Sequence, residues 1–256
     1  MESQTLLDDM YRPVERVLTA EVGAVGDRAV LDVGCGTGDT TVAVARSVTE
    51  RGRCVGVDVS EAMVAAARER AERAGSAASF VVADAQEHRF GTAFDVVMSR
   101  FGVMFFTDPV RAFANLRRSA RSGGDLRCVV WRGSGENPFM TTAERAAVPH
   151  LPGIPAREPD APGQFGLADP DRIRAVLSAA GWSGIAVDPL DVAVAMPEPE
   201  LAGYVTRFGP VGAALRGADA GTVARVVEAV RPAFDPFVDG DEVRFTAACH
   251  LVRATA

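Results

Sequence analysis

The sequence predicts an α/β fold with a doubly wound, mostly parallel sheet of seven strands. Residues 30–33 form an apolar strand pattern that runs into a glycine-rich loop and then into a helical pattern. This order is typical of the nucleotide crevice of an open parallel sheet. Strand and helix patterns then alternate as far as residue 131, which favours parallel strands joined by right-handed crossovers. We expect only the last strand to run antiparallel.

The first half of the chain carries clear signals for individual elements. Apolar side chains recur at helical spacing in residues 4–20. Ser60 is a good N-cap for the helix that follows it, and Asp108 with Pro109 marks the start of another helix. The expected strands lie at 30–34, 53–57, 78–83, 94–99 and 125–131, with a further helix at 38–50.

The second half departs from this regular alternation. Residues 132–168 hold six of the fifteen prolines, with a short helix expected at 138–147. Beyond them, Asp169 and Pro170 start a helix that ends at Gly181. The remaining expected elements are a strand within 184–195, helices at 201–208 and 223–230, and a final strand at 243–252.

We expect one domain over residues 1–256. The insertions at 132–168 and 197–240 leave the carboxyl ends of two strands, at the edge where open α/β sheets bind ligands. Together with the helix in residues 1–20, these insertions are candidates for a substrate lid. The alternative is that their helices only pad one face of the sheet.

Composition restricts the class of partner. The net charge of −7 makes the chain a poor non-specific partner for nucleic acid or an anionic membrane. The N-terminus lacks a signal-peptide pattern, and no apolar stretch approaches the about 20 residues that span a bilayer. We therefore expect a cytoplasmic protein. No metal-binding spacing links the cysteines, so we expect no metal and reduced thiols at Cys35, Cys54, Cys128 and Cys249.

The glycine loop favours a nucleotide without phosphates. Dinucleotide loops read G-x-G-x-x-G/A, whereas Gly34 and Gly36 are followed by Asp39 at the third position. A carboxylate at the start of a helix would repel a pyrophosphate there. S-adenosylmethionine carries no phosphate and is cationic at its sulfonium and amino groups, so it suits this loop better. The alternative for the glycines is a tight turn without a ligand.

Acidic residues at two strand ends fit an adenosine. Asp58 follows the loop by about twenty residues, where a carboxylate can accept hydrogen bonds from ribose hydroxyls. Asp84 can accept from the adenine amino group, while a neighbouring N–H group, at Ala85, can donate to a ring nitrogen. Met63 could pack on the adenine face or belong to the core.

Five motifs in order resemble the class I S-adenosylmethionine-dependent methyltransferases. The resemblance is greatest to the bacterial small-molecule branch near the ubiquinone/menaquinone-biosynthesis C-methyltransferases, and it covers about half of the chain. The motifs are VLDVGCGTG (30–38), VGVDVS (55–60), VADAQE (82–87), FDVVMSRFGVMFFTDP (94–109) and RSGGDLRCVVW (121–131).

This resemblance implies a cofactor site. The loop glycines would line the methionine and ribose, Asp32 would hold the amino group through water or the loop, and Ser99 would offer its backbone to the methionine end. The whole implied cofactor set is Asp32, Gly34, Cys35, Gly36, Gly38, Asp58, Val59, Met63, Asp84, Ala85 and Ser99.

The acceptor is expected to be a small molecule, such as a natural-product intermediate, methylated on O, C or N. The sequence after residue 98 lacks the [DN]PPY motif of amino-methylating enzymes and the carboxylates of magnesium-dependent catechol enzymes. Arg100 could pair with an acidic substrate or with Asp108, and Trp131 and Asn137 are further candidates for substrate contact. His150 is the candidate general base.

Three other functions compete with methyl transfer. An S-adenosylmethionine-binding protein with a cyclase-like or regulatory role would need the same motifs. A nicotinamide dehydrogenase is disfavoured by Asp39. A purely structural module does not account for acidic residues at several strand ends. The oligomeric state stays open.

Overall fold

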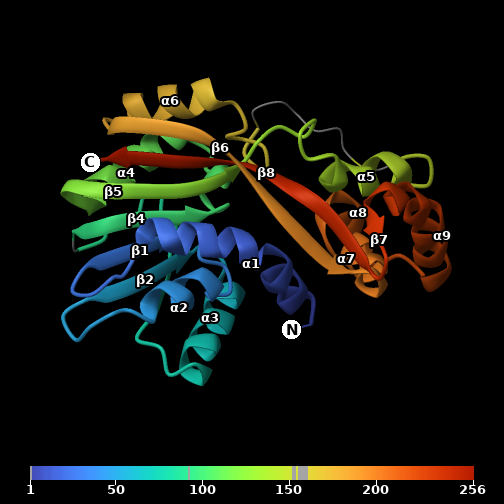
Figure 1. Cartoon of the computed structure of the whole chain (residues 1–256), viewed down its shortest axis with the longest axis horizontal. Helices are drawn as coiled ribbons and strands as arrows, with labels where there is room; N and C mark the ends of the chain where they lie inside the picture. Colours follow the sequence, from blue (N-terminus) through green and yellow to red (C-terminus); the bar gives the residue numbers. More distant parts are fainter. Residues whose placement is uncertain (1, 92, 152–153, 155–160) are drawn as a thin grey trace. The chain divides into compact units, whose positions relative to one another are not determined.

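The computed structural model describes residues 2–91, 93–151, 154 and 161–256 and shows a mixed α/β protein (Figure 1). Its eight-stranded sheet has the order β3-β2-β1-β4-β5-β8-β6, and β7 pairs with β8 beside this path. The strands from β1 to β5 pair in parallel, and β8 runs antiparallel to β5. The predicted fold class is thereby confirmed, with a two-residue strand added to the expected seven.

The strands are β1 (Ala29–Val33), β2 (Arg53–Asp58), β3 (Ser79–Val82), β4 (Phe94–Arg100), β5 (Ala120–Trp131), β6 (Ser183–Pro197), β7 (Val238–Asp239) and β8 (Glu242–Thr255). The helices are α1 (Glu2–Val22), α2 (Asp39–Ala45), α3 (Glu61–Arg73), α4 (Pro109–Ser119), α5 (Pro138–Ala147), α6 (Pro170–Ala179), α7 (Leu201–Arg207), α8 (Gly209–Ala214) and α9 (Ala220–Val230).

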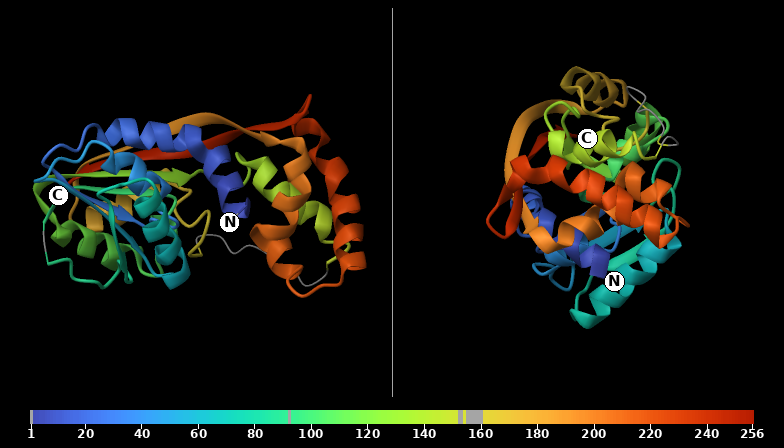
Figure 2. Two further views of the ribbon diagram at one scale, coloured as in Figure 1. Left: turned by 90° about the horizontal axis from the view of Figure 1, so that it is seen from below. Right: turned by 90° about the vertical axis from the view of Figure 1, so that its right-hand side faces the viewer.

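Contacts divide the chain into two compact units. The sheet unit comprises Val14–Arg132, Asp160–Leu190 and Cys249–Ala256, and the helical unit comprises Met1–Pro13, Gly133–Pro159 and Asp191–Ala248. In the helical unit, α5 packs against α8 and α9, and α7 packs against both of these helices (Figure 2). The expected single domain and its lid segments stay predictions, and 152–153 and 155–160 of the first insertion lie outside the described residues.

Capping side chains start the helices where the sequence predicts. Ser60 accepts a hydrogen bond from the N–H of Met63 at 3.3 Å at the start of α3. Asp108 accepts from the N–H of Arg111 at 3.0 Å at the start of α4. Asp169 plays the same part for α6, accepting from the N–H of Asp171 at 2.9 Å. Each cap satisfies a donor that the first helical turn leaves without a partner.

Two predicted boundaries in the sheet unit are wrong. The helix expected at 38–50 ends at Ala45, because residues 47–49 leave it to bond with residues 25–26: Gly26 donates to the Ser47 carbonyl at 2.9 Å, and Thr49 donates to the Gly26 carbonyl at 3.1 Å. The strand expected at 125–131 begins at Ala120, where it already pairs with Phe94 across an irregularity in register.

A further boundary in the helical unit is also wrong. The helix expected at 201–208 ends at Arg207, since Phe208 is extended and Gly209 has a φ of 65°. A separate short helix, α8, then begins.

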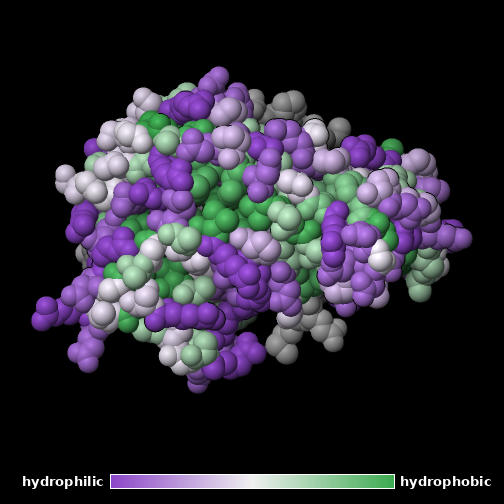
Figure 3. Space-filling model, viewed as in Figure 1, coloured by the Kyte–Doolittle hydropathy of each residue, from purple (hydrophilic) through white to green (hydrophobic). Residues whose placement is uncertain are grey.

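Figure 3 shows hydrophilic side chains over much of this face, with hydrophobic side chains gathered near its middle. Among the described residues, no helix combines the length and apolar character that a membrane crossing requires.

Candidate active site

The glycine loop that follows β1 is held tightly by the neighbouring strand. The N–H groups of Gly34 and Cys35 both donate to the carbonyl of Val57, at 2.8 and 3.0 Å. A Cβ atom added to Gly34 would lie 2.6 Å from the Cα of Gly102, so only glycine fits there. Gly36 differs, because a Cβ atom added to it would meet no heavy atom within 4 Å. Tight packing therefore explains Gly34, while the space beside Gly36 is open to a ligand.

Asp58 connects the end of β2 to this loop. Its Oδ2 accepts a hydrogen bond from the N–H of Gly36 at 2.9 Å, and its Oδ1 accepts one from the N–H of Ser60 at 2.9 Å. A carboxylate has about four acceptor positions, so two remain for a ligand. Beside it, Val59 is 68% and Met63 is 40% exposed. Met63 is therefore not a core residue, and this turn presents a carboxylate next to apolar surface.

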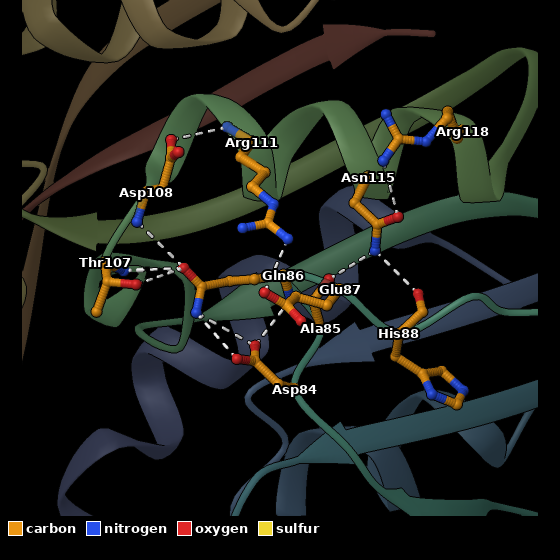
Figure 4. A network of polar contacts seen from close by, with 10 residues as sticks. All are labelled: Asp84, Ala85, Gln86, Glu87, His88, Thr107, Asp108, Arg111, Asn115 and Arg118. Carbon is orange, nitrogen blue, oxygen red and sulfur yellow. Dashed lines mark hydrogen bonds and ion pairs between the residues drawn. The ribbon is translucent and has the colours of Figure 1, made fainter.

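The loop after β3 forms the polar network drawn in Figure 4. The side-chain amide of Gln86 donates to both oxygens of Asp84, at 3.3 and 3.1 Å. Its Oε1 accepts from the N–H of Thr107 at 2.9 Å and from the N–H of Asp108 at 3.2 Å. Gln86 thus couples the predicted adenine-binding carboxylate to the start of α4.

Asn115, on α4, holds the same loop from the other side. This buried side chain donates from Nδ2 to the carbonyls of Ala85 and His88, both at 2.9 Å, and accepts from Arg118 at 3.0 Å (Figure 4). Sequence reasoning missed both Gln86 and Asn115. Asn115 offered one signal, since it is a polar residue on the apolar stripe of a helix.

Two predicted cofactor residues, Asp32 and Ser99, have buried side chains with hydrogen-bond partners in the sheet unit. Asp32 is 1% exposed and accepts from the hydroxyl of Thr41 at 2.6 Å. Burial raises the pKa of Asp32 to about 6, while the Thr41 hydrogen bond and the charge of Arg100 act in the opposite direction. Direct contact between Asp32 and a ligand is therefore not supported, and an effect through the loop stays a prediction.

Ser99 also has a structural side chain. It is completely buried, donates to the Val33 carbonyl at 2.7 Å, and accepts from the N–H groups of Gly102 and Val103 at 3.1 and 3.2 Å. These bonds fix the loop after β4 against the end of β1. Cys35 is 9% exposed, and burial raises the pKa of its thiol above the usual range. It therefore stays a neutral packing residue in the loop.

The loop after β4 contains a residue in an unusual backbone conformation. Phe101 has a φ of 67°, and among the described residues it is the one non-glycine residue with positive φ. Its N–H donates to the Val129 carbonyl at 2.9 Å, and its ring stacks on Trp131 with centroids 4.4 Å apart. Such strain persists where the surroundings determine it, and it is frequent at functional sites. Trp131 is 3% exposed, so Phe101 presents more surface than the predicted substrate residue.

Asp39 is not the free carboxylate that the sequence suggests. It forms an ion pair with Arg70 at 2.7 Å, and its side chain is 12% exposed. The pair neutralises much of the charge that was expected to repel a phosphate. The choice of nucleotide therefore rests on Gly36, Asp58 and the relatives described below, and less on Asp39.

Two predicted substrate-site residues belong to the helical unit. Asn137 is fully buried, and its amide group donates to the carbonyl of Ala248 at 2.9 Å and accepts from the N–H of Ala248 at 3.0 Å. These bonds show a structural role for the Asn137 side chain, and its contact with a substrate stays a prediction. His150 is exposed in the turn after α5, where its N–H donates to the Ala147 carbonyl at 2.8 Å. Its role as a base stays a prediction.

The geometry of the sheet unit fits S-adenosylmethionine. The space beside Gly36 admits a ligand close to the backbone, Asp58 has acceptor capacity for hydroxyl groups, and Met63 offers apolar surface. These features adjoin the carboxyl ends of β1 and β2, which is where open α/β sheets bind nucleotides.

Known proteins agree with this fit. A family described as "Methyltransferase domain" matches residues 30–124. Aklanonic acid methyltransferase DauC of Streptomyces sp. (strain C5) is 31% identical over 153 residues, which cover 56% of this chain and 69% of that protein. The ubiquinone/menaquinone biosynthesis C-methyltransferase UbiE of Ralstonia nicotianae is 38% identical over 118 residues. That alignment covers 46% of this chain and 49% of UbiE, so it spans about half of the relative's length.

Among solved structures, the [4+2]-cyclase SpnF has a TM-score of 0.59 and 23% identity, with 95% of this chain and 82% of that chain covered. This likeness shows the fold alone, and one fold serves many reactions. The site defines an enzyme of the nucleotide-binding α/β class. The chain belongs to the class I S-adenosylmethionine-dependent methyltransferases, in the group related to UbiE. S-adenosylmethionine is therefore its cofactor, and a cyclase-like or regulatory role is not favoured.

Proposed function

We propose that this chain methylates a small organic acceptor, such as a natural-product intermediate, and that the carboxyl ends of β1, β2 and β3 hold S-adenosylmethionine. One observation carries the assignment of the site: the Asp58 carboxylate bonds the N–H of Gly36 and still has acceptor positions free. The ligand that suits this carboxylate is a ribose with two neighbouring hydroxyl groups.

The chain's residues have distinct parts in binding. Gly36 leaves room for close approach, and Asp58 accepts from the ribose hydroxyls. Met63 packs on one face of the adenine, and Asp84 with Ala85 meets its polar edge. When bound, S-adenosylmethionine supplies an electrophilic methyl group, and the protein then has to orient the acceptor and exclude water. Orientation alone can contribute about 7–11 kcal/mol to such a reaction.

The class of acceptor follows from charge and from the relatives. A net charge of −7 disfavours nucleic acid as the acceptor. The relatives named above methylate aklanonic acid or serve quinone biosynthesis, and both are small-molecule activities. The cytoplasmic location expected from the sequence stays a prediction.

Calorimetric titration with S-adenosylmethionine, S-adenosylhomocysteine and NAD tests the cofactor assignment. We expect micromolar binding of both sulfur nucleotides and none of NAD. Acceptors are then screened by mass spectrometry for products that gain one methyl group. Binding of NAD in place of the sulfur nucleotides would overturn the proposed site, whereas binding without any methylated product would support a non-methylating role.

A further inference from the structure

Arg100, the last residue of β4, has an unsatisfied buried donor. Its Nη1 atom is buried and lacks a hydrogen-bond partner. Among the described residues, its guanidinium forms no hydrogen bond and no ion pair. A buried donor without a partner is unfavourable, and it is more so when the group is charged. This position therefore has a hydrogen-bonding capacity that the described residues do not use.

Strand register places Arg100 beside the glycine loop. Asp32 on β1 pairs with Met98 on β4, so Arg100 lies level with Gly34, two residues further along each strand. Alternation along a strand puts the side chains of residues 98 and 100 on the same face. On its other side, Arg100 pairs with Val129, two residues before Trp131. Arg100 thus stands between the loop assigned to the cofactor and the aromatic end of β5.

Two other partly buried arginines of the sheet unit have carboxylate partners. Arg70 pairs with Asp39 at 2.7 Å, and Arg253 pairs with Glu21 at 2.6 Å. Within the described part of the chain no carboxylate pairs with Arg100, although its charge partly opposes the rise that burial causes in the pKa of Asp32. The sequence allowed an ion pair between Arg100 and Asp108, but the Asp108 carboxylate caps the start of α4 instead. The missing partner of Arg100 therefore has the chemistry of an anion.

We propose that Arg100 binds a carboxylate group of a ligand in this site. The inference rests on the proposed function, since it assumes a ligand beside Gly34 and Gly36. A guanidinium binds a carboxylate through two parallel N–H···O bonds. The buried Asp32 and the nearby Asp58 make a singly charged carboxylate a better fit than a doubly charged phosphate. The carboxylate belongs either to the methionine part of S-adenosylmethionine or to the acceptor.

Calorimetry on the full chain separates these two sources. The first arm compares S-adenosylhomocysteine with 5′-methylthioadenosine, which has the same adenosine but no amino-acid group. If Arg100 holds the cofactor carboxylate, Arg100→Met will bind S-adenosylhomocysteine at least tenfold more weakly and 5′-methylthioadenosine equally well. Arg51→Met, which changes an exposed arginine, is the matched control and will leave both affinities unchanged.

The second arm titrates the S-adenosylhomocysteine complex with benzoate and with benzamide, its uncharged analogue. If Arg100 holds an acceptor carboxylate, the wild type will prefer benzoate, and Arg100→Met will lose this preference while its nucleotide affinities stay the same. The two preferences measured are that for S-adenosylhomocysteine over 5′-methylthioadenosine and that for benzoate over benzamide. The proposal is overturned if Arg100→Met keeps both preferences of the wild type, or if the wild type shows neither. Failure of the wild type to bind 5′-methylthioadenosine would instead count against the proposed function.

Thermal unfolding of the ligand-free variants checks whether the substitutions at Arg100 disturb the fold. Removal of a buried, unpartnered charge should leave the Tm of the ligand-free protein unchanged or higher. Arg100→Lys keeps the charge but loses the planar fork, so its preference for the carboxylate ligand should be intermediate. A ligand-free Tm lowered in both variants would show a structural role and overturn the proposal.

Discussion

The Asp58 carboxylate and the Gly36 N–H are joined by a hydrogen bond of 2.9 Å, which links the end of β2 to the loop after β1. Asp58, which we assign to the ribose, therefore also stabilises the glycine loop that we assign to the methionine part of the cofactor. Its second oxygen bonds the Ser60 N–H at 2.9 Å, so the same carboxylate also orders the approach to α3. Substitution of Asp58 will consequently affect the ligand contact and the loop together.

We predict that Asp58→Ala binds S-adenosylhomocysteine 10- to 100-fold more weakly. Loss of charge-assisted hydrogen bonds of this kind is worth about 1.5–3 kcal/mol. Asp58→Asn should be intermediate, because its amide oxygen can still accept one of the two backbone N–H groups. Calorimetric titration measures both variants, with Glu61→Gln, an exposed acid at the start of α3, as the control. Wild-type affinity in Asp58→Ala would refute the ribose assignment.

Gly36→Ala should weaken nucleotide binding without loss of the fold. Gly36 and Gly75 have φ values of 54° and 57°, and a Cβ atom on either would meet nothing within 4 Å. Alanine at either position should therefore cost a similar amount of strain, about 1–2 kcal/mol. Only Gly36→Ala should lower the affinity for S-adenosylhomocysteine in calorimetry. If both variants bind as the wild type does, the glycine loop is not the site.

Gly34→Ala should act on stability. Its Cβ atom would lie 2.6 Å from the Cα of Gly102, in a place where two backbones meet. Overpacking of this kind lowers the free energy of unfolding by about 1–3 kcal/mol. Gly102→Ala should have a similar effect, since its Cβ atom would contact the Val33 carbonyl. Urea unfolding of both variants checks this expectation, and unchanged midpoints would mean that the loops can separate at little cost.

The sequence was sufficient for features that depend on local pattern. Alternating strands and helices predicted the parallel sheet, and cap residues such as Ser60 and Asp108 predicted where helices begin. These signals are local because a cap acts within one helical turn. The early end of α2 escaped prediction because it depends on hydrogen bonds between residues 47–49 and residues 25–26.

Site features that depend on distant partners could not be predicted. The bonds from Asn115 to Ala85 and His88 join residues 30 and 27 positions apart. The hydrogen bonds of Asn137 could not be predicted for the same reason, because its partner, Ala248, is 111 positions away. A polar side chain in a sequence does not reveal whether the fold or a ligand uses its hydrogen bonds.

Asn115→Ala should lower both stability and nucleotide affinity. It would leave the carbonyls of Ala85 and His88 without their donor, at about 1–3 kcal/mol in the free energy of unfolding. Because the loop that carries Asp84 would be less ordered, S-adenosylhomocysteine and 5′-methylthioadenosine should lose affinity equally. Urea unfolding and calorimetry provide the two readouts. Arg118→Ala, which removes only the donor to Asn115, is the control and should change neither by much.

Asp32→Asn should change how stability depends on pH. Burial raises the pKa of Asp32 from its ordinary value of 3.8 to about 6, so the folded state binds this proton more tightly than the unfolded state. Asp32 therefore contributes stability below about pH 4 that is lost as the pH rises through about 6, which amounts to roughly 3 kcal/mol. The variant should gain stability relative to the wild type between these pH values and keep a constant advantage above them.

Thr41→Val removes a hydrogen bond that lowers the pKa of Asp32, so the loss of stability in this variant should extend to higher pH. Urea unfolding over a pH series measures the free energy of unfolding of each variant and of the wild type. A difference between Asp32→Asn and the wild type that does not depend on pH would show that Asp32 is ionised at little cost in the folded protein.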